Sequence, residues 1–372
     1  MGTRPQGRIL LLVLAAGLLA TATAACGDSN DSSSTSGSTG GASASLSGEI
    51  AGAGSTAQQA AQEAWIAGFQ EANSGVSIAY DPVGSGGGRE QFTAGGVAYA
   101  GSDAALDPDE LKAAEGTCGG TNNVVEVPNY VSPIAIIYNV SGVDSLQLSP
   151  DTLANIFAQK ITKWNDPAIA TDNPGADLPD TNITPVNRSD ESGTTENFTD
   201  YLSQAAPSIW TYEVSGDWPV KGGEAAEGTS GVVDAVTNGD GTIGYADASQ
   251  AGELGIALIK VGSDYVGPSP EAAAKVLELS PEDKEAEKGK YVFAFSVDRK
   301  TESSGTYPII LVSSMIACTK YGSADEAAVV KAYFEYVISP EGQELAAEQA
   351  GSAPLSDALR TKFMPAIESI EG

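Results

Sequence analysis

A single arginine stands among hydroxyl residues, glycine and two acids in residues 188–194, which read RSDESGT. A guanidinium surrounded by hydroxyl and amide donors is suited to anion binding, because it offers a planar fork of donors and keeps its charge. The two acids in the same segment narrow the ligand to one that tolerates a fixed negative charge nearby.

Two earlier segments have the same order of a strand, a turn of small residues and a helix. The turn GAGSTA at 52–57 lies between an expected strand at 48–51 and an expected helix at 58–72. The turn VGSGGG at 83–88 follows an expected strand at 76–80 and precedes another helix start. This order of elements predicts an α/β fold with parallel strands.

These turns place hydroxyls and unpaired backbone N–H groups at helix N-termini, where the partial positive charge favours anions. The simpler alternative is that Thr56 and Ser85 cap their helices. Because the third turn, after an expected strand at 183–187, has the same design, convergence on one shared anion is favoured. Residues 52–57 also match the dinucleotide fingerprint G-x-G-x-x-[GA], with Asp81 further on. The second glycine turn directly after Asp81 argues against that rival.

The composition excludes several classes of function. The formal net charge of the 372 residues is −30, which argues against nucleic acid or an anionic membrane surface as partner. There is no histidine, so Ser-His-Asp and Cys-His catalysis and His-ligated zinc are excluded. Motifs of the Ser-x-x-Lys and G-x-S-x-G types are absent as well. We therefore expect a protein that is not an enzyme and has no metal and no cofactor.

The N-terminus has the features of an export signal. Residues 1–25 contain two arginines, an apolar run at 9–20 and small residues before Cys26. The stretch TAAC resembles a bacterial lipobox, which predicts acylation of Cys26 and a lipid-anchored Ser/Gly tether at 26–46. The alternative is a plain secreted protein.

Two further cysteines, Cys118 and Cys318, lie far apart in the chain. In an exported protein an even pair predicts a disulfide more than a metal site or a redox centre. We therefore expect these two residues to be bonded.

Six segments occur in the order found in one known family: GAGSTA, VGSGGG, AGSDAAL, ITKWNDPAI, NRSDESGTTENFTDYL and GTIGYAD. From about Gly48 onwards the chain resembles the substrate-binding protein of the high-affinity phosphate ABC transporter. The leader and the cysteine pair are most similar to the actinobacterial members. The resemblance implies a two-lobed α/β periplasmic-binding-protein (Venus flytrap) fold, similar to type II, with hinge strands and phosphate buried in the cleft.

The same resemblance implies the boundaries of the two lobes. Lobe I would comprise residues 47–139 and 314–372, and lobe II residues 140–313. The apolar runs PNYVSPIAIIYN and TYPIILVSSMIAC would be the crossing strands. We also expect a solvated, helix-rich insertion at 262–290 and a core helix at 325–338.

The resemblance also implies a set of phosphate ligands. They are Thr56, Ala57, Ser85, Asp103, Arg188, Ser192, Gly193 and Thr194. Asp190 would orient the guanidinium. Asp103 would accept the proton that phosphate retains near neutral pH; sulfate has no such proton, so an unpaired carboxylate would disfavour it. The alternative for Asp103 is a helix cap or a surface turn.

Two positions depart from the family pattern. Ala57 stands where the family often has an aromatic residue, although only its main chain would bind. Glu191 stands in place of a frequent glycine, and we expect its carboxylate to face solvent.

The predicted function is binding of inorganic phosphate and its delivery to the permease and ATPase subunits of an ABC transporter. The protein would be lipid-anchored at the extracytoplasmic face of the cell membrane, with a monomeric body. Two alternatives stay open. One is a receptor for another tetrahedral oxyanion (sulfate, molybdate or arsenate), although Asp103 argues against the first two. The other is a secreted phosphatase-like hydrolase with an undetected carboxylate metal site.

Overall fold

The computed structural model describes residues 45–284 and 289–372, which belong to one compact unit. The expected signal peptide, Cys26 and the expected tether as far as residue 44 lie outside the described residues. Leu46, at the end of that tether, already packs against the hydrophobic core. Within the described ranges, no helix is both long and apolar enough to cross a membrane.

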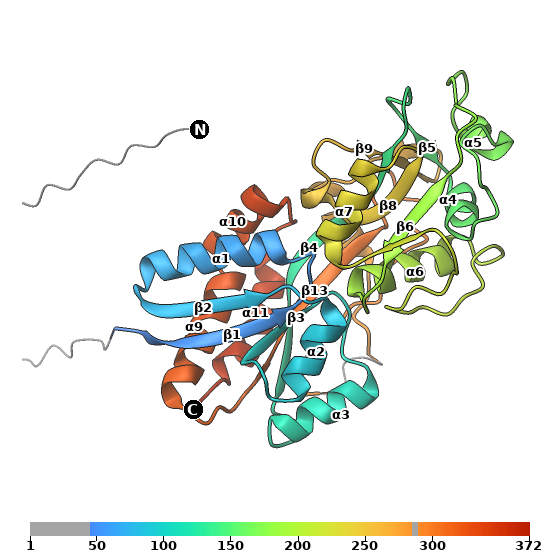
Figure 1. The fold of residues 1–372 in the computed structure, drawn as a ribbon. Helices are drawn as coiled ribbons and strands as arrows, with labels where there is room; N and C mark the ends of the chain where they lie inside the picture. Colours follow the sequence, from blue (N-terminus) through green and yellow to red (C-terminus); the bar gives the residue numbers. More distant parts are fainter. Residues whose placement is uncertain (1–44, 285–288) are drawn as a thin grey trace, which may run out of the picture. The chain divides into compact units, whose positions relative to one another are not determined.

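The larger sheet runs in the order β2-β1-β3-β13-β4-β8-β6-β7, and β9 and β12 add to β4 (Figure 1). Its strands are β1 (Ser47–Gly54), β2 (Gly75–Asp81), β3 (Tyr99–Ser102), β4 (Val124–Asn139), β6 (Thr184–Arg188), β7 (Glu224–Ala226), β8 (Thr242–Asp247), β9 (Gly255–Ile256), β12 (Tyr291–Val292) and β13 (Ile310–Cys318). A smaller sheet contains β5 (Gln147–Leu148), β10 (Leu258–Val261) and β11 (Asp264–Val266).

The long strand β4 joins the two halves of the larger sheet. Residues 124–133 of β4 pair antiparallel with β13, and residues 134–139 pair antiparallel with β8. β13 in turn pairs with β3, so that β4 and β13 lie between the group β2-β1-β3 and the group β8-β6-β7 (Figure 1). β13 falls within the second apolar run predicted to cross between lobes, and β4 contains the first run but begins four residues before it, at Val124. They are almost entirely buried, as expected for continuous apolar strands.

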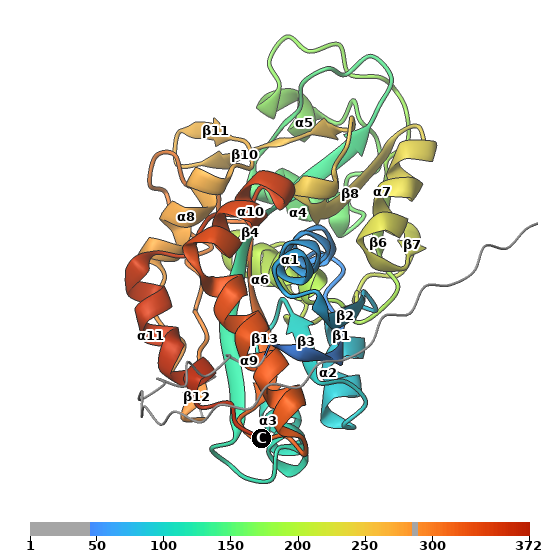
Figure 2. The same ribbon diagram turned by 90° about the vertical axis from the view of Figure 1, so that its left-hand side faces the viewer.

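The helices cover both halves of this sheet. They are α1 (Gln59–Ala72), α2 (Ser85–Thr93), α3 (Pro108–Thr117), α4 (Pro150–Phe157), α5 (Pro167–Asp172), α6 (Gly193–Ala205), α7 (Gly228–Asn238), α8 (Pro270–Leu279), α9 (Ala324–Ile338), α10 (Pro340–Ala350), α11 (Asp357–Glu368) and the 3₁₀ turn η1 (Ala248–Gln250). The C-terminal helices α9 and α10 contact α1, and α9 contacts β1, so the C-terminal helices pack against the first elements of the described body (Figures 1 and 2).

The predicted strand–helix–strand unit at the start of the body is confirmed. β1 and β2 are parallel, and α1 connects them. Trp65 and Phe69 of α1 are buried in the core, because apolar residues at helical spacing share one face of a helix. The predicted helix at 325–338 is α9, whose apolar residues Val329, Val330, Phe334 and Val337 are buried.

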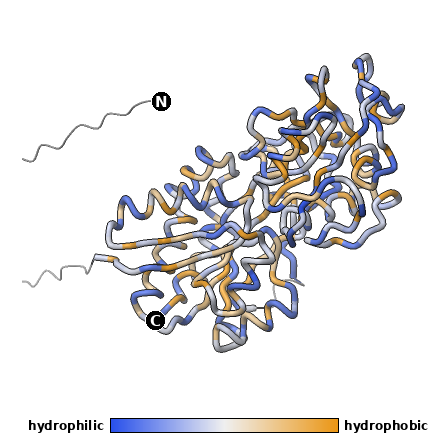
Figure 3. Tube along the Cα trace, viewed as in Figure 1, coloured by the Kyte–Doolittle hydropathy of each residue, from blue (hydrophilic) through white to orange (hydrophobic). Residues whose placement is uncertain are grey.

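The prediction of a solvated, helix-rich insertion at 262–290 is wrong for α8. That segment contains β11 and α8, and α8 buries an apolar face formed by Ala272, Ala273, Val276 and Leu277. Alanine and charged residues dominate this sequence and hid its amphipathic pattern. Residues 285–288 of the segment lie outside the described residues. Hydrophobic residues elsewhere follow the strands inside the body, and the outer turns are mainly hydrophilic (Figure 3).

Cys118 and Cys318 form the predicted disulfide, with a Cα–Cα distance of 5.1 Å. Cys118 follows α3, and Cys318 ends β13. The bond therefore ties α3 to the sheet close to the start of β4.

Candidate anion-binding site

The first glycine turn connects β1 to α1. Gln58 occupies the N-cap position of α1, and its side chain forms no capping hydrogen bond. Ser55 Oγ lies in the turn before it and accepts hydrogen bonds from the backbone N–H groups of Ala57 (3.1 Å) and Gln58 (3.3 Å). Thr56 instead points to a distant segment, where its Oγ1 lies 2.9 Å from Oγ1 of Thr229 and accepts from the Thr229 N–H at 3.1 Å. The interpretation of Thr56 as a helix cap is therefore wrong.

The second turn connects β2 to α2. Gly84 stands at the N-cap position of α2 without a side chain, and the hydroxyl of Ser85 accepts a hydrogen bond from the Asp103 N–H at 3.1 Å. Ser85 is therefore not a cap either. Gly84 has φ +89°, and a Cβ there would lie 2.6 Å from Oδ2 of Asp190. The second turn thus lies directly against the third.

Asp103 follows β3 and is 4% exposed. Its carboxylate accepts hydrogen bonds from Ser313 Oγ of β13 and from Thr194 Oγ1 of α6, the latter at 3.1 Å. The predicted alternative, that Asp103 caps the next helix, is wrong because Asp107 caps α3. Asp103 is instead a buried acceptor between β3, β13 and α6.

The environment of Asp103 raises its pKa. Burial is the largest cause, because removing a carboxylate from water disfavours its charged form. Hydrogen bonds from Ser313, Ser55 and Thr194 and the positive charge of Arg188 oppose this rise. The carboxyl group therefore retains a proton more readily than in water, and its oxygens lie within reach of both donors and a cation.

The third turn contains a buried arginine with its own acid. Arg188 is 3% exposed, and its Nε and Nη2 donate to the two carboxylate oxygens of Asp190, Nε at 2.8 Å. Oδ1 of Asp190 also accepts from the Gly228 N–H at 3.0 Å. Although burial raises the pKa of Asp190, the hydrogen bonds and charge of Arg188 outweigh it and lower the pKa overall. Asp190 thus remains ionised and fixes the plane of the guanidinium.

The segment after Arg188 begins α6. Ser192 caps this helix by accepting from the Thr195 N–H at 3.2 Å. Gly193 packs so closely that a Cβ would lie 2.6 Å from Ser85 Oγ and 2.7 Å from the Asp103 Cβ. Ser192 and Thr194 are each 1% exposed. The absence of a side chain at Gly193 thus allows the third turn to lie against the second turn and against Asp103.

Glu191, between these residues, does not simply face solvent as expected. Its side chain is 35% exposed, and Oε1 lies 2.9 Å from Nη2 of Arg89 on α2. The third turn is therefore joined to α2 by an ion pair beside the buried residues.

The predicted site residues thus occupy adjoining turns, with one difference in detail. The N–H of Ala57, expected to bind the ligand, donates to Ser55 Oγ in this structure.

Sequence reasoning missed Thr229 and the segment around it. Residues 226–230, AEGTS, join β7 to α7 with small residues, which is the design of the other three turns. The stretch AEGTS was the signal that could have found this turn, and it was overlooked because the strand before it, β7, has only three residues.

The N-termini of α1, α2, α6 and α7 are therefore brought together around Arg188 and Asp103. Helix N-termini have free N–H groups and a partial positive charge, so four of them with one guanidinium create a local site for an anion in an acidic protein. The buried carboxyl group of Asp103 adds one acceptor among these donors. This arrangement suits an oxyanion that has a proton.

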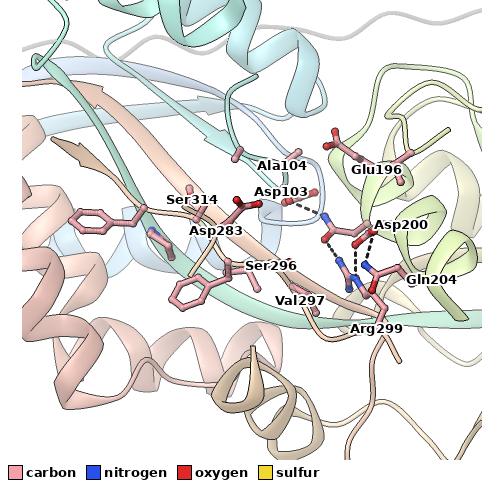
Figure 4. Close-up of a pocket in the computed structure, with 18 residues that line it drawn as sticks. Asp103, Ala104, Glu196, Asp200, Gln204, Asp283, Ser296, Val297, Arg299 and Ser314 are labelled. Atoms are coloured by element: carbon pink, nitrogen blue, oxygen red, sulfur yellow. Dashed lines mark hydrogen bonds and ion pairs between the residues drawn. The ribbon is translucent and has the colours of Figure 1, made fainter. Parts of the chain in front are cut away.

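A cavity of about 270 Å³ adjoins the site on the side of β13 (Figure 4). Asp103, Glu196, Asp200 and Arg299 line it, and Arg299 Nε donates to Asp200 at 2.9 Å. Asn197 links the two regions: its Nδ2 donates to the carbonyl of Asp103 at 2.7 Å, and its Oδ1 accepts from Arg299. The cavity thus lies behind the loop that holds Asp103.

The sequence over residues 38–341 matches the model of the PBP superfamily domain, so the chain belongs to that superfamily. Solved structures share this fold. They include a high-affinity periplasmic phosphate-binding protein, PfluDING, determined with phosphate (TM-score 0.73, 23% identity, covering 86% of this chain and 93% of that one). A phosphate-binding protein from Stenotrophomonas maltophilia has a TM-score of 0.67 with 21% identity, covering 86% of this chain and 94% of that one.

Within the superfamily, this chain belongs to the PstS family of phosphate-binding proteins. It is 34% identical over 366 residues to phosphate-binding protein PstS2 of Mycobacterium bovis, covering 96% of this chain and 97% of that protein. Phosphate-binding protein PstS 3 of Mycobacterium leprae is 33% identical over 314 residues, covering 83% of this chain and 84% of that protein.

Proposed function

We propose that this protein binds inorganic phosphate between two lobes and delivers it to the permease of a phosphate ABC transporter. The observation that carries this proposal is that one buried site contains both a cation, Arg188, and a carboxyl group that can accept a proton, Asp103. Arg188 is held by Asp190, and the Asp103 carboxyl group lies among hydroxyl donors. Phosphate near neutral pH has both charged oxygens and a proton, so it uses both groups. Fully ionised sulfate uses only the first.

In this proposal the ligands are the backbone and hydroxyl donors of the first three turns together with Asp103 and Arg188. The set is Thr56, Ala57, Ser85, Asp103, Arg188, Ser192, Gly193 and Thr194. Lobe I consists of residues 47–139 and 314–372, and lobe II of residues 140–313. The position of β4 and β13 between the two groups of strands supports this division. Closure of the lobes around the anion is the change that a permease would recognise.

We further propose that acylated Cys26 anchors the protein at the extracytoplasmic face of the membrane. A lipobox-like stretch before Cys26 and the tether composition of residues 27–46 support this placement. The relatives are named as binding proteins, which agrees with a receptor that has no catalytic activity of its own. Metabolic labelling with a radioactive fatty acid in wild type and Cys26→Ala tests the anchor; equal labelling would contradict it.

Calorimetric titration tests the proposed ligand. We expect tight one-to-one binding of phosphate, no heat with sulfate, and loss of phosphate binding in Arg188→Ala, which should stay folded by circular dichroism. Arg360→Ala is the matched control, because Arg360 pairs with Asp357 on α11. Equal affinity for sulfate, or unchanged phosphate affinity in Arg188→Ala, would refute the assignment. Turnover of a chromogenic phosphate ester would favour a hydrolase instead.

A further inference from the structure

Arg89 is a buried cation next to the site, and it is not one of the proposed phosphate ligands. Its side chain is 5% exposed and lies on α2, one turn after Ser85. Nε donates to Oε1 of Glu110 at 2.8 Å, and Nη1 donates to Oγ of Ser102 at 2.9 Å. Ser102 in turn donates to the carbonyl of Ala104. Arg89 therefore connects α2, the start of α3 and the loop that contains Asp103.

The remaining donor of Arg89 reaches the other group of elements. Nη2 donates to Oε1 of Glu191 at 2.9 Å, and Glu191 follows β6 in the third turn. The backbone also meets here, since the Gly86 N–H donates to the Glu191 carbonyl at 3.4 Å. The contact thus joins α2, which packs on β1 and β3, to the segment that follows β6.

Two glycines leave space for the Glu191 carboxylate. A Cβ at Gly86 would lie 1.3 Å from Oε2, and a Cβ at Gly216 would lie 2.3 Å from Oε1. Neither glycine has a positive φ, so the space around Glu191, rather than the backbone conformation, disfavours a side chain there. The carboxylate is thus seated between the first turn of α2 and the loop around residue 216.

The charges make this contact asymmetric. If the two groups of elements separate, Arg89 keeps Glu110 and Ser102, whereas Glu191 loses its cation. Burial raises the pKa of Glu191, and the charge of Arg89 opposes that rise, while Glu110 and Asp217 add negative charge nearby. An acid in such surroundings depends on a cationic partner, here Arg89, to stay ionised. The energy of the pair therefore stabilises the arrangement in which α2 and the third turn meet.

We propose that the Arg89–Glu191 ion pair is a latch that holds the two lobes closed and slows the release of the ligand. The proposal rests on the proposed function for the identity of the ligand. The latch itself rests on contacts that include no ligand atom. Because the pair forms between the lobes, it acts on the equilibrium between open and closed protein and through it on the apparent affinity.

The test compares wild type with Glu191→Gln, which keeps the size of the side chain and removes its charge. Dyes attached through ketone amino acids at the exposed positions Lys112 (α3) and Asn238 (α7) report the distance between the lobes in single molecules. We expect the closed population without phosphate to fall about tenfold in the variant, and the phosphate dissociation rate to rise about tenfold. The association rate should change less than about twofold.

Asp180→Asn is the matched control. It removes the same charge from the exposed Lys163–Asp180 pair and should change neither quantity. Identical distance distributions and dissociation rates in wild type and Glu191→Gln would overturn the latch. If wild type does not bind phosphate but Glu191→Gln still opens the protein, the proposed ligand is wrong and the latch stands. If wild type does not bind phosphate and Glu191→Gln leaves the distance distribution unchanged, both proposals are wrong.

Discussion

Glu126, a fully buried acid on β4, offers a quantitative test of the structure. One carboxylate oxygen accepts from the Leu106 N–H at 3.2 Å, and the other has no hydrogen-bond partner among the described residues. Burial is the main cause that raises the pKa of Glu126 from 4.5 to about 8; the Leu106 hydrogen bond and the charge of Arg89 oppose it. Glu126 is therefore neutral in the folded protein at neutral pH.

The sign of the resulting pH dependence follows from this rise. The unfolded chain releases the Glu126 proton above pH 4.5, whereas the folded protein keeps it up to about pH 8. This contribution to stability is fully present below pH 4.5 and is lost as the pH rises through that window. Each pH unit within the window costs about 1.4 kcal/mol, so stability falls by about 2.5 kcal/mol between about pH 5 and about pH 7.

The perturbation is Glu126→Gln, which cannot ionise. We expect the unfolding free energy of the variant, relative to wild type, to increase by about 2.5 kcal/mol between about pH 5 and about pH 7, as measured by urea unfolding at each pH. Because both proteins contain the other buried acids, the comparison with wild type cancels the contribution of those acids to the pH dependence of the unfolding free energy. Glu348→Gln, on an exposed position of α10, is the control and should show no such trend. A difference between Glu126→Gln and wild type that does not vary with pH would refute the reasoning.

Three further changes test the site and the fold. Thr229→Val removes the hydroxyl that lies 2.9 Å from Thr56 and should weaken phosphate binding about fivefold in a calorimetric titration, whereas unchanged affinity would remove Thr229 from the site. Gly193→Ala forces a methyl group against Ser85 and Asp103 and should weaken binding about 10- to 100-fold while circular dichroism stays unchanged. Cys118→Ala with Cys318→Ala opens a link across 200 residues and should lower the unfolding free energy by about 3–5 kcal/mol; equal stability with and without reductant in wild type would contradict this.

Local sequence patterns predicted the elements well where one element depends mainly on its own residues. The alternation of strand, small-residue turn and helix at the first two turns correctly predicted β1, α1, β2 and α2, because apolar periodicity and turn chemistry act within about twenty residues. The lack of histidine and the charge of −30 also excluded whole classes of chemistry without any structure. The pairing of Cys118 with Cys318 followed from the number of cysteines in an exported chain.

The roles of individual polar residues depended on the tertiary structure. Thr56, Ser85 and Asp103 each fit a helix cap in sequence, yet Gln58, Gly84 and Asp107 occupy the cap positions. The hydroxyl of Thr56 is directed to Thr229 of α7, and Asp103 meets Ser313 of β13, far along the chain.

The ion pair of Glu191 with Arg89 was hidden for the same reason: the two residues are 102 positions apart. Composition and spacing therefore determined that this protein has turns suited to an anion. Only the packing of β3, β13, α6 and α7 decided which side chains meet, because burial and hydrogen bonding between distant segments depend on the whole sheet rather than on any local pattern.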